Sequence, residues 1–569
     1  MPHRNASVHA STGGIRAPGG FAEVLAGRLL EAGLLDAVQL EYARQKHAVS
    51  GDALWRIVIN EGLAGEREVV SLLSGVLGIA FMDIDTVEYP EQDVLALFNK
   101  EQCLTANFLP LGFEDRDLLV LLGNAMPDDV AQTVMRRLGV RCRFRLAPFS
   151  QVARLIRNAY YFAKNPPEKL LAQEVTLLSS DRDHAFTPEH LLSHLLHLAM
   201  RERATDIHIT SGIASLHILF RIDGVLQPIR ALPLTLGRLI GYIKIVSEMD
   251  ISEARRPQDG SFRAVVLDDP LTVRVSIIIT EHGERMVMRL LPEAHEIKDL
   301  GALGFFAEDV ETVAAAMANP AGLILITGPT GSGKSSTLHA GLRMQHLIER
   351  NVLTVEDPLE YRVPMAGQTE VNRRAGYDFG TALRHFLRHD PDVILVGEMR
   401  DAETAQAAVD AAATGHLVLS TLHVTSVFGV VPRLTPFGLV PQVIAENLKL
   451  VINQRLVRRL CSHCAETVAF TSAECAWLDV DEGTLGKASK GCKRCRLTGF
   501  HGRLPLYELL KIDERMANAI ADAAGREAIR ALAAEQGFET IARIAKRRVR
   551  LGQTTADEVL RVIGEGPGK

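Results

Sequence analysis

The sequence predicts a multidomain α/β protein whose largest domain is built around a parallel sheet. Its 569 residues exceed what one hydrophobic core organises, since single domains run to about 100–200 residues. Between residues 301 and 460, short apolar runs alternate with amphipathic helical segments; the runs read LILITG, VLTVED, VILVGE and LVLSTL. Apolar strands separated by helices are typical of a parallel sheet that helices cover on both faces.

The composition is that of an ordinary globular protein, with 47% apolar and 23% charged residues, and it excludes wholesale disorder. The formal charge is −6, from 63 basic and 69 acidic side chains, which argues against binding to nucleic acid by phosphate neutralisation. No apolar run has the length of a bilayer span or of a signal peptide. We therefore expect a cytoplasmic protein.

The amino-terminal third contains a leader, a repeat and a small α/β unit. Residues 1–20 are rich in Gly and Ser and are expected to be disordered. Two similar segments follow, with Gly-Leu turns at Gly33 and Gly62, and this spacing of about 29 residues predicts paired helical hairpins. Alternating strands and helices continue to residue 162, which closes the expected first domain, residues 21–162.

A polar segment with a Pro-Pro pair, residues 163–186, is the best candidate for a linker. A second α/β domain is expected from residue 187 to about residue 300, since a helical segment is followed there by several β-rich runs. The carboxyl-terminal part holds two Cys-x-x-C pairs within residues 461–500 and then helices over residues 501–569.

One loop matches the phosphate-binding pattern G-x-x-x-x-G-K-S completely, and it lies between a predicted strand and a predicted helix. Its residues are Gly328, Pro329, Thr330, Gly331, Ser332, Gly333, Lys334, Ser335 and Ser336. The glycines let backbone amides surround phosphates, and the helix amino terminus favours their negative charge. We expect Lys334 to reach the β- and γ-phosphates of ATP and Ser335 to hold Mg²⁺.

Hydrolysis requires acids close to the metal and the attacking water. Two apolar strands downstream of the loop end in such acids, Glu356 and Glu398. Both are expected at the carboxyl edge of the sheet, where open α/β folds bind their ligands.

These motifs together resemble the ATPases of type II secretion and type IV pilus assembly, the GspE/PilB family. The matching segments are GPTGSGKSS (328–336), TVEDPLEY (354–361), RHDPDVILVGEMRD (388–401) and TGHLVLSTLH (414–423). They correspond to the Walker A, Asp, Walker B and His boxes of the family. The resemblance covers residues 185–569 strongly and residues 21–160 more weakly.

The resemblance implies a RecA-like P-loop core over residues 301–460, a PAS-like α/β N2 domain over residues 187–300 and a helical amino-terminal domain. It implies that Glu398 is the Walker B acid and that Glu356 orients the water, although the two could exchange roles. His416 and His423 of the His box would sense the γ-phosphate. In the N2 domain, which carries ATDIHI, RIDG, RRPQDG and GERMVMRLL, the expected phosphate contacts are Arg221, Arg274 and Arg289, which could act on the nucleotide of a neighbouring subunit.

The four paired cysteines, Cys461, Cys464, Cys492 and Cys495, form two knuckles with 27 residues between them. In a reducing compartment this spacing indicates a structural Zn²⁺ site with no open ligand position. A zinc ribbon that reads DNA is the alternative, but few basic residues and no aromatic platform accompany the knuckles. Cys103, Cys142 and Cys475 stand alone and are expected to be ordinary apolar side chains.

The amino-terminal repeats resemble a family domain that docks the motor to a membrane partner and in some members binds cyclic di-GMP. The version that binds this ligand carries R-L-G before each turn glycine. This chain has Val24-Leu25-Ala26 and Ala53-Leu54-Trp55 instead. Both arginines and both glycines are missing, so we expect no binding of cyclic di-GMP.

The sequence thus predicts an ATP hydrolase that acts as a hexameric motor, peripheral to the inner membrane through platform and docking proteins, and that drives pseudopilus assembly for type II secretion. Type IV pilus extension is the alternative. A nucleic-acid translocase is disfavoured by the negative charge and by the Asp and His boxes, and a scaffold without turnover is disfavoured by intact Lys334, Glu356 and Glu398. A pilus retraction motor would lack the long amino-terminal extension and the cysteines.

Overall fold

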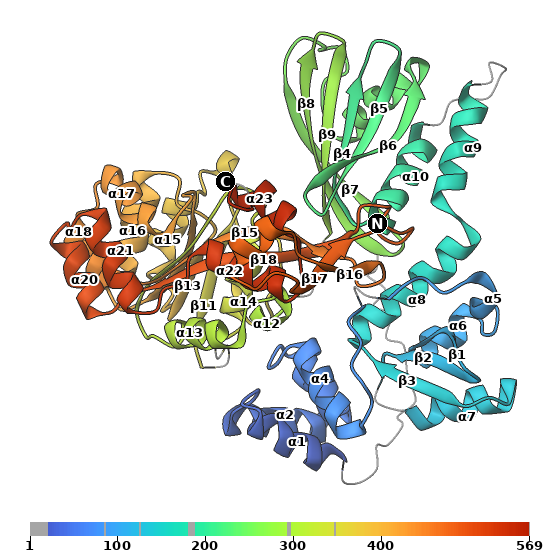
Figure 1. Ribbon diagram of the computed structural model, residues 1–569, viewed down its shortest axis with the longest axis horizontal. Coiled ribbons are helices and arrows are strands. Elements are labelled where there is room, and N and C mark those ends of the chain that lie inside the picture. Colours follow the sequence, from blue (N-terminus) through green and yellow to red (C-terminus); the bar gives the residue numbers. More distant parts are fainter. Residues whose placement is uncertain are drawn as a thin grey trace, which may run out of the picture. The chain divides into compact units, whose positions relative to one another are not determined.

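The computed structural model describes residues 21–567 except 85–86, 125–126, 180–187, 293–296, 346 and 348 (Figure 1). The leader expected at residues 1–20 lies outside the described residues. The chain divides into two compact units, residues 1–156 and residues 157–569. Within the described part of the chain, no helix has both the length and the apolar character needed to cross a membrane.

The first unit begins with two helical hairpins. Their helices are α1 (Phe21–Glu31), α2 (Ala37–Ser50), α3 (Leu54–Asn60) and α4 (Glu66–Leu77). Gly33 and Gly62 turn the chain with φ of 64° and 69°, a backbone conformation that favours glycine. The residue after each glycine donates its backbone N–H to the carbonyl five residues earlier, at 3.0 Å in both hairpins, which is the Schellman helix ending. The predicted pair of helical hairpins is therefore present, with its turns at the predicted glycines.

A small α/β unit follows the hairpins. Its elements are α5 (Gln92–Leu95), α6 (Lys100–Thr105), β1 (Phe108–Glu114), β2 (Asp117–Leu122), α7 (Pro127–Leu138), β3 (Cys142–Leu146) and α8 (Phe149–Lys164). The strand order is β1-β2-β3, with β1 antiparallel and β3 parallel to β2. The parallel pair requires a crossover connection, and α7 supplies it.

The expected linker needs correction, because residues 167–179 form helix α9 (Pro167–Ser179). Leu171 and Val175, one helical turn apart, are buried in the same apolar cluster as α10 (Pro188–Arg201). The Pro-Pro pair starts this helix, as proline at a first helical position does. Residues 180–186 of the expected linker lie outside the described residues.

The second unit contains an antiparallel sheet of six strands in the order β6-β5-β4-β9-β8-β7. The strands are β4 (Ala204–Ser211), β5 (Ser215–Ile222), β6 (Val225–Pro233), β7 (Gln258–Val266), β8 (Asp269–Thr280) and β9 (Gly283–Pro292). Helices α10, η2 (Leu234–Gly237) and α11 (Arg238–Val246) cover one face with a shared apolar core. Polar side chains, including the predicted arginines, alternate onto the other face.

The ATPase sheet has seven strands in the order β12-β11-β13-β14-β10-β15-β18. They are β10 (Gly322–Thr327), β11 (Val352–Glu356), β12 (Gly367–Glu370), β13 (Val393–Val396), β14 (Leu417–Leu422), β15 (Leu448–Leu460) and β18 (Phe500–Lys511). All neighbours run parallel except the antiparallel pair β15 and β18. The predicted parallel sheet is therefore present.

Helices cover both faces of this sheet, over two separate apolar clusters. One face carries α15 (Phe379–Phe386), η4 (Val427–Gly429), α16 (Ala402–Ala413), α17 (Val430–Leu434), η5 (Thr435–Phe437), α18 (Pro441–Asn447), α20 (Glu514–Ala521) and α21 (Arg526–Glu535). The other carries α12 (Leu300–Leu303), α13 (Ala307–Met317), α14 (Lys334–Leu342), α19 (Ser472–Leu478), α22 (Ile541–Arg550) and α23 (Ala556–Ile563). A short turn, η3 (Arg373–Ala375), follows β12.

The carboxyl-terminal part is thus no separate helical region. Residues 500–511 form the sheet strand β18, and the helices after it divide between the two faces of the ATPase sheet. The cysteine segment is inserted between β15 and β18 and adds a two-stranded hairpin, β16 (Ala465–Ala469) with β17 (Leu485–Ser489).

Candidate functional site

The phosphate-binding loop connects the carboxyl end of β10 with the first residue of α14. Gly328, Gly331 and Gly333 have φ of 139°, 77° and 87°, which side chains with a Cβ atom rarely adopt. Lys334 Nζ donates hydrogen bonds to the carbonyls of Gly328 (3.0 Å) and Pro329 (3.1 Å). Burial lowers the pKa of Lys334, and the nearby carboxylates of Glu398 and Glu360 oppose this shift.

A cavity of about 1700 Å³ lies over the loop and exceeds the roughly 300–1,000 Å³ of typical ligand pockets. Loop residues 329–336, both strand-end acids, His423 and the three predicted arginines line this cavity. Of the predicted nucleotide-site residues, Gly328 and His416 do not line it. The structure therefore brings most of the predicted side chains to one place.

Glu356, at the end of β11, is buried and held by neighbouring side chains. Its Oε1 accepts hydrogen bonds from Thr354 Oγ1 (2.9 Å) and Gln368 Nε2 (3.3 Å). Its Oε2 lies 3.1 Å from His339 Nε2, and the other ring nitrogen of His339 lies 2.8 Å from the carbonyl oxygen of Ser335. Burial alone would lower the pKa of His339, but the contacts with Glu356 raise it overall. These contacts hold the side chain of Glu356 in a fixed orientation.

Glu398 follows β13 and is more open to the cavity than Glu356. Its Oε1 lies 2.6 Å from Arg400 Nη2, and its Oε2 lies 3.4 Å from His423 Nε2. Strands β11, β13 and β14 are parallel neighbours, and they pair without shifts in register. Their carboxyl ends therefore place Glu356, Glu398 and His423 at one edge of the sheet.

The three predicted arginines lie on the polar face of the antiparallel sheet, and two of them share one buried acid. Asp206 Oδ1 accepts a hydrogen bond from Arg289 Nε (3.0 Å), and Asp206 Oδ2 lies 3.7 Å from Arg221 Nε. Arg274 Nη2 lies 3.9 Å from Asp357 Oδ1, in the residue directly after Glu356. All three arginines remain partly exposed, with side-chain exposures of 57%, 37% and 44% for Arg289, Arg221 and Arg274.

The structure separates His416 from His423, although both were expected to sense the γ-phosphate. His416 precedes β14, whereas His423 follows it, so the six-residue strand separates them by roughly 20 Å at about 3.3 Å per residue. His416 Nδ1 donates instead to the carbonyl of Ala411 at 2.9 Å, which closes the end of α16. The two histidines share a motif, but the length of the strand assigns them to opposite edges of the sheet.

Several side chains of the site are absent from the sequence prediction. His339, Thr354 and Gln368 surround Glu356, and Asp206 holds two arginines. The spacing Thr354-x-Glu356 could have revealed one of them, because alternate residues of a strand point to the same face. His339 and Gln368 come from other elements, and no local sequence pattern predicts that they contact Glu356.

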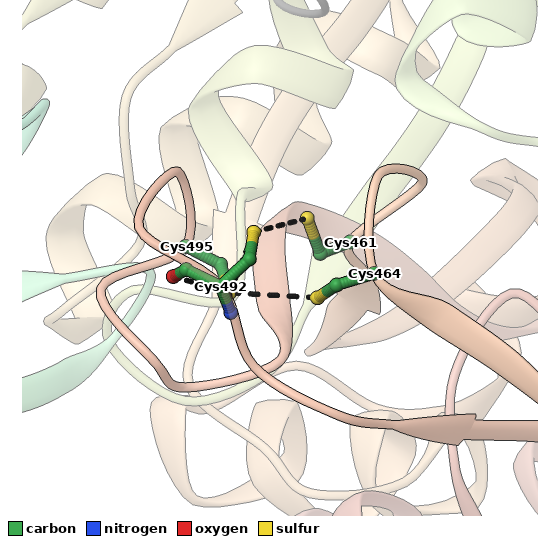
Figure 2. A group of neighbouring side chains, drawn as sticks. All are labelled: Cys461, Cys464, Cys492 and Cys495. Atoms are coloured by element: carbon green, nitrogen blue, oxygen red, sulfur yellow. Dashed lines mark hydrogen bonds between the residues drawn. The ribbon is translucent and has the colours of Figure 1, made fainter.

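The four paired cysteines converge as predicted, and Figure 2 shows the two knuckles facing each other. All four sulfur atoms lie within 4.8 Å of one another. Sγ–Sγ distances are 4.0 Å for Cys461–Cys492, 3.7 Å for Cys464–Cys495 and 3.7 Å for Cys492–Cys495. A tetrahedral Zn²⁺ with bonds of about 2.3 Å requires sulfur separations of about 3.8 Å. The residues therefore fit a structural zinc ion.

The backbone supports this assignment. Cys495 Sγ accepts N–H groups from Cys492 (3.1 Å) and Gly499 (3.2 Å). Burial raises the pKa of Cys495, but these hydrogen bonds outweigh burial and lower it to about 7. Amide donors stabilise the thiolate that a metal requires. The hairpin β16–β17 and helix α19 lie between the knuckles and account for their 27-residue separation.

A model of the type II/IV secretion system protein family matches residues 181–561, which is well over half of the chain. The chain belongs to the type II/IV secretion system protein family. As a member of this family of secretion ATPases it is an ATP-hydrolysing enzyme, as the sequence predicted. A second model, the MshEN domain, matches residues 77–166. This match covers the small α/β unit and not the helical repeats.

Individual relatives agree with this family. The chain is 41% identical to the type II secretion system protein E of Klebsiella pneumoniae over 388 residues, 68% of this chain and 77% of the relative. It is 33% identical to the type IV pilus assembly ATPase PilB of Thermus thermophilus over 534 residues, 90% of this chain and 59% of the relative. Among solved structures, the Legionella pneumophila ATPase DotB aligns with a TM-score of 0.49 at 24% identity, over 67% of this chain and 96% of that one.

Proposed function

We propose that this secretion ATPase is the motor of a type II secretion system, which hydrolyses ATP to assemble a pseudopilus. The observation that carries this proposal is the phosphate-binding loop together with two strand-end acids and three arginines around one cavity. The 41% identity to type II secretion system proteins E from several bacteria supports the choice of machine.

The proposed roles follow from position. The amides of residues 328–336 and the Lys334 ammonium bind the phosphates, and Ser335 is placed to hold Mg²⁺ at the start of α14. Bound Mg²⁺ neutralises phosphate charge during hydrolysis. Glu356, fixed by Thr354 and Gln368, orients the attacking water, while Glu398 supports the metal side of the site.

The arginines and His423 are proposed to stabilise negative charge on the phosphates during hydrolysis. Arg221, Arg274 and Arg289 are partly exposed, so they are available to a triphosphate, including that of a neighbouring subunit in a homohexamer. Such cations act on charge that develops in the transition state. Rotation of the 187–300 domain against the ATPase domain would then transmit force to a membrane platform protein.

The remaining assignments concern ligands and location. Cys461, Cys464, Cys492 and Cys495 hold a structural Zn²⁺, because the four sulfurs leave no open position for substrate. The motor works at the cytoplasmic face of the inner membrane through platform and docking proteins. Cyclic di-GMP is not a ligand, since Val24, Ala26, Ala53 and Trp55 replace the residues of its motif. Direct binding to nucleic acid is not part of the function.

Extension of a type IV pilus is the second candidate. The Thermus thermophilus relative named a pilus assembly ATPase matches 90% of this chain, whereas the type II relatives match 66–69%. The longer match favours a pilus role, and the higher identity favours the secretion role. The two machines require the same chemistry from the site.

A chromosomal Lys334→Ala strain tests both candidates. Lys490→Ala is the matched control, because Lys490 forms an exposed ion pair with Glu466, and exposed pairs contribute little. Exoproteins in medium and periplasm are quantified, and surface pili are counted on the same cultures. Trapped exoproteins with normal pili support the secretion motor. Normal secretion on cells without pili assigns the protein to pilus extension, and an unchanged Lys334→Ala strain contradicts both.

A further inference from the structure

Gln454 lies behind the phosphate-binding loop, on the strand next to it. Strand β15 pairs in parallel with β10, and its Asn453 is the partner of Thr327, the last residue before the loop. Gln454 therefore lies beside the junction between β10 and the loop. It is only 2% exposed, and it is not among the residues that line the nucleotide cavity.

The side-chain amide of Gln454 joins the loop to the helix that follows it. Its Nε2 donates to the carbonyl oxygen of Ser332 at 2.8 Å. Its Oε1 accepts from Thr337 Oγ1 at 2.8 Å, in the first turn of α14. Both contacts are buried, so water cannot replace them without cost.

Two loop glycines are packed directly against Gln454. A Cβ atom at Gly328 would lie 2.3 Å from the backbone oxygen of Gln454, and a Cβ atom at Gly333 would lie 2.8 Å from its Nε2. Real Cβ atoms do not approach other atoms this closely, so both positions require glycine. The two glycines at the ends of the motif therefore serve contact with β15 in addition to contact with phosphate.

The hydrogen bond to Ser332 also fixes the orientation of a peptide group. In a planar trans peptide the C=O and the following N–H point in opposite directions. Because the Ser332 carbonyl points back to Gln454, the Gly333 N–H points away from Gln454 and toward the cavity side of the loop. An N–H in that direction is a phosphate donor, whereas a flipped peptide would present a carbonyl oxygen there.

We propose that Gln454 is a positioning residue of the ATPase: its amide holds the 332–333 peptide in the orientation that binds phosphate. The inference rests on the proposed nucleotide site and deepens it. Gln454 contacts no substrate and acts only through Ser332 and Thr337. Its removal is expected to weaken nucleotide binding more than its effect on folding would explain.

Gln454→Met and Gln454→Glu test this role in the full-length protein. Methionine keeps the volume and removes both hydrogen bonds. Glutamate keeps the acceptor for Thr337 but turns an oxygen toward the Ser332 carbonyl. The control is Gln345→Met, because Gln345 is also buried, donates to the carbonyl of Met317 at 3.0 Å and lies beyond the opposite end of α14.

Titration with a fluorescent ATP analogue and Mg²⁺ measures the effect, alongside thermal unfolding. We expect Kd to rise roughly tenfold to a hundredfold in both Gln454 variants, the range that one or two lost buried hydrogen bonds give. Gln345→Met should lower the unfolding temperature to a similar degree and leave Kd within about twofold of the parent. An unchanged Kd in Gln454→Met, with equal destabilisation in both methionine variants, would overturn the proposal.

Two further variants separate the possible failures. Thr337→Val removes one of the two hydrogen bonds at nearly constant volume and should raise Kd by a smaller factor, even if Gln454→Met does not fold. An unchanged Kd there would also count against the role. Lys334→Ala should abolish binding; if it binds the analogue normally, the nucleotide site itself is wrong. If Lys334→Ala loses binding while the Gln454 variants keep it, only the role of Gln454 fails.

Discussion

The phosphate-binding loop and the cysteine knuckles are both connected to strand β15, yet different forces hold them. The loop packs against Gln454 near the middle of the strand, and Cys461 follows directly after its end. Two large apolar clusters cover the sheet around the loop. Around the knuckles, the buried cluster consists of cysteines alone.

The hairpin between the knuckles extends this contrast. Four of the five residues of β16 and three of the five of β17 are exposed, so this hairpin buries little apolar surface. With the Zn²⁺ proposed above, metal–thiolate bonds would hold the knuckles, as they hold small metal modules. The loop, in comparison, is shaped by hydrogen bonds to a strand of a large apolar core. The protein thus contrasts a site shaped by neighbouring residues with a site that a metal ion would hold together.

The largest expected effect tests whether a metal ion holds the cysteine knuckles together. Removing zinc with a chelator, or by Cys461→Ser, should unfold the two knuckles at residues 461–464 and 492–495 locally, because structural zinc contributes on the order of 10 kcal/mol. Zinc content by mass spectrometry and amide hydrogen exchange measure the change. Nucleotide binding should stay within about threefold of the parent. Cys142→Ser, outside the module, is the control, and a Cys461→Ser protein that retains zinc would contradict the assignment.

The next effect separates chemistry from binding at the loop. Glu356→Gln should lower kcat by about 10²–10⁴, the usual contribution of a positioned base, with little change in nucleotide Kd. Steady-state ATPase assays and nucleotide titration measure both quantities. The matched control is Glu370→Gln, since Glu370 ends the neighbouring strand and pairs in register with Glu356. If kcat falls in Glu398→Gln and not in Glu356→Gln, then Glu398 orients the water and Glu356 supports the metal.

A smaller effect tests the edge assignment of the histidines. His423→Ala should lower kcat by roughly tenfold, because its ring lies 3.4 Å from Glu398 and one charge-assisted contact contributes about 1.5–3 kcal/mol at most. His416→Ala should stay within about twofold, since it only closes α16. Parallel kcat measurements on the two variants decide this, and an equal loss in both would show that His416 also serves a nucleotide.

The smallest effect concerns pH. The folded protein raises the pKa of His339 above its ordinary value, through Glu356 and against burial. The resulting stabilisation is complete below about pH 6.5 and is lost as pH rises through the raised folded pKa. Unfolding temperatures of the parent should therefore fall over this range relative to those of His339→Phe. Identical pH profiles for the two proteins would show that the pair contributes nothing.

The sequence by itself determined the elements whose signal is local. The phosphate loop, the apolar strands around it, the glycine turns at Gly33 and Gly62 and the four paired cysteines are all present where they were predicted. Each depends on a short pattern, such as a strand followed by glycines and then a helix, and tertiary contacts do not override such patterns. Family membership followed from the order of these motifs.

The tertiary structure decided what depends on distance along the fold. In the folded protein, His416 and His423 lie at opposite edges of the sheet. Residues 500–511 form a strand of the ATPase sheet, and part of the expected linker forms α9. The tertiary structure also brought His339 to Glu356 and Gln454 to the loop, across 17 and more than 100 residues of sequence. Local patterns encode which residues can form a site, but strand order and strand length decide which of them meet, because those properties arise only when the whole sheet has formed.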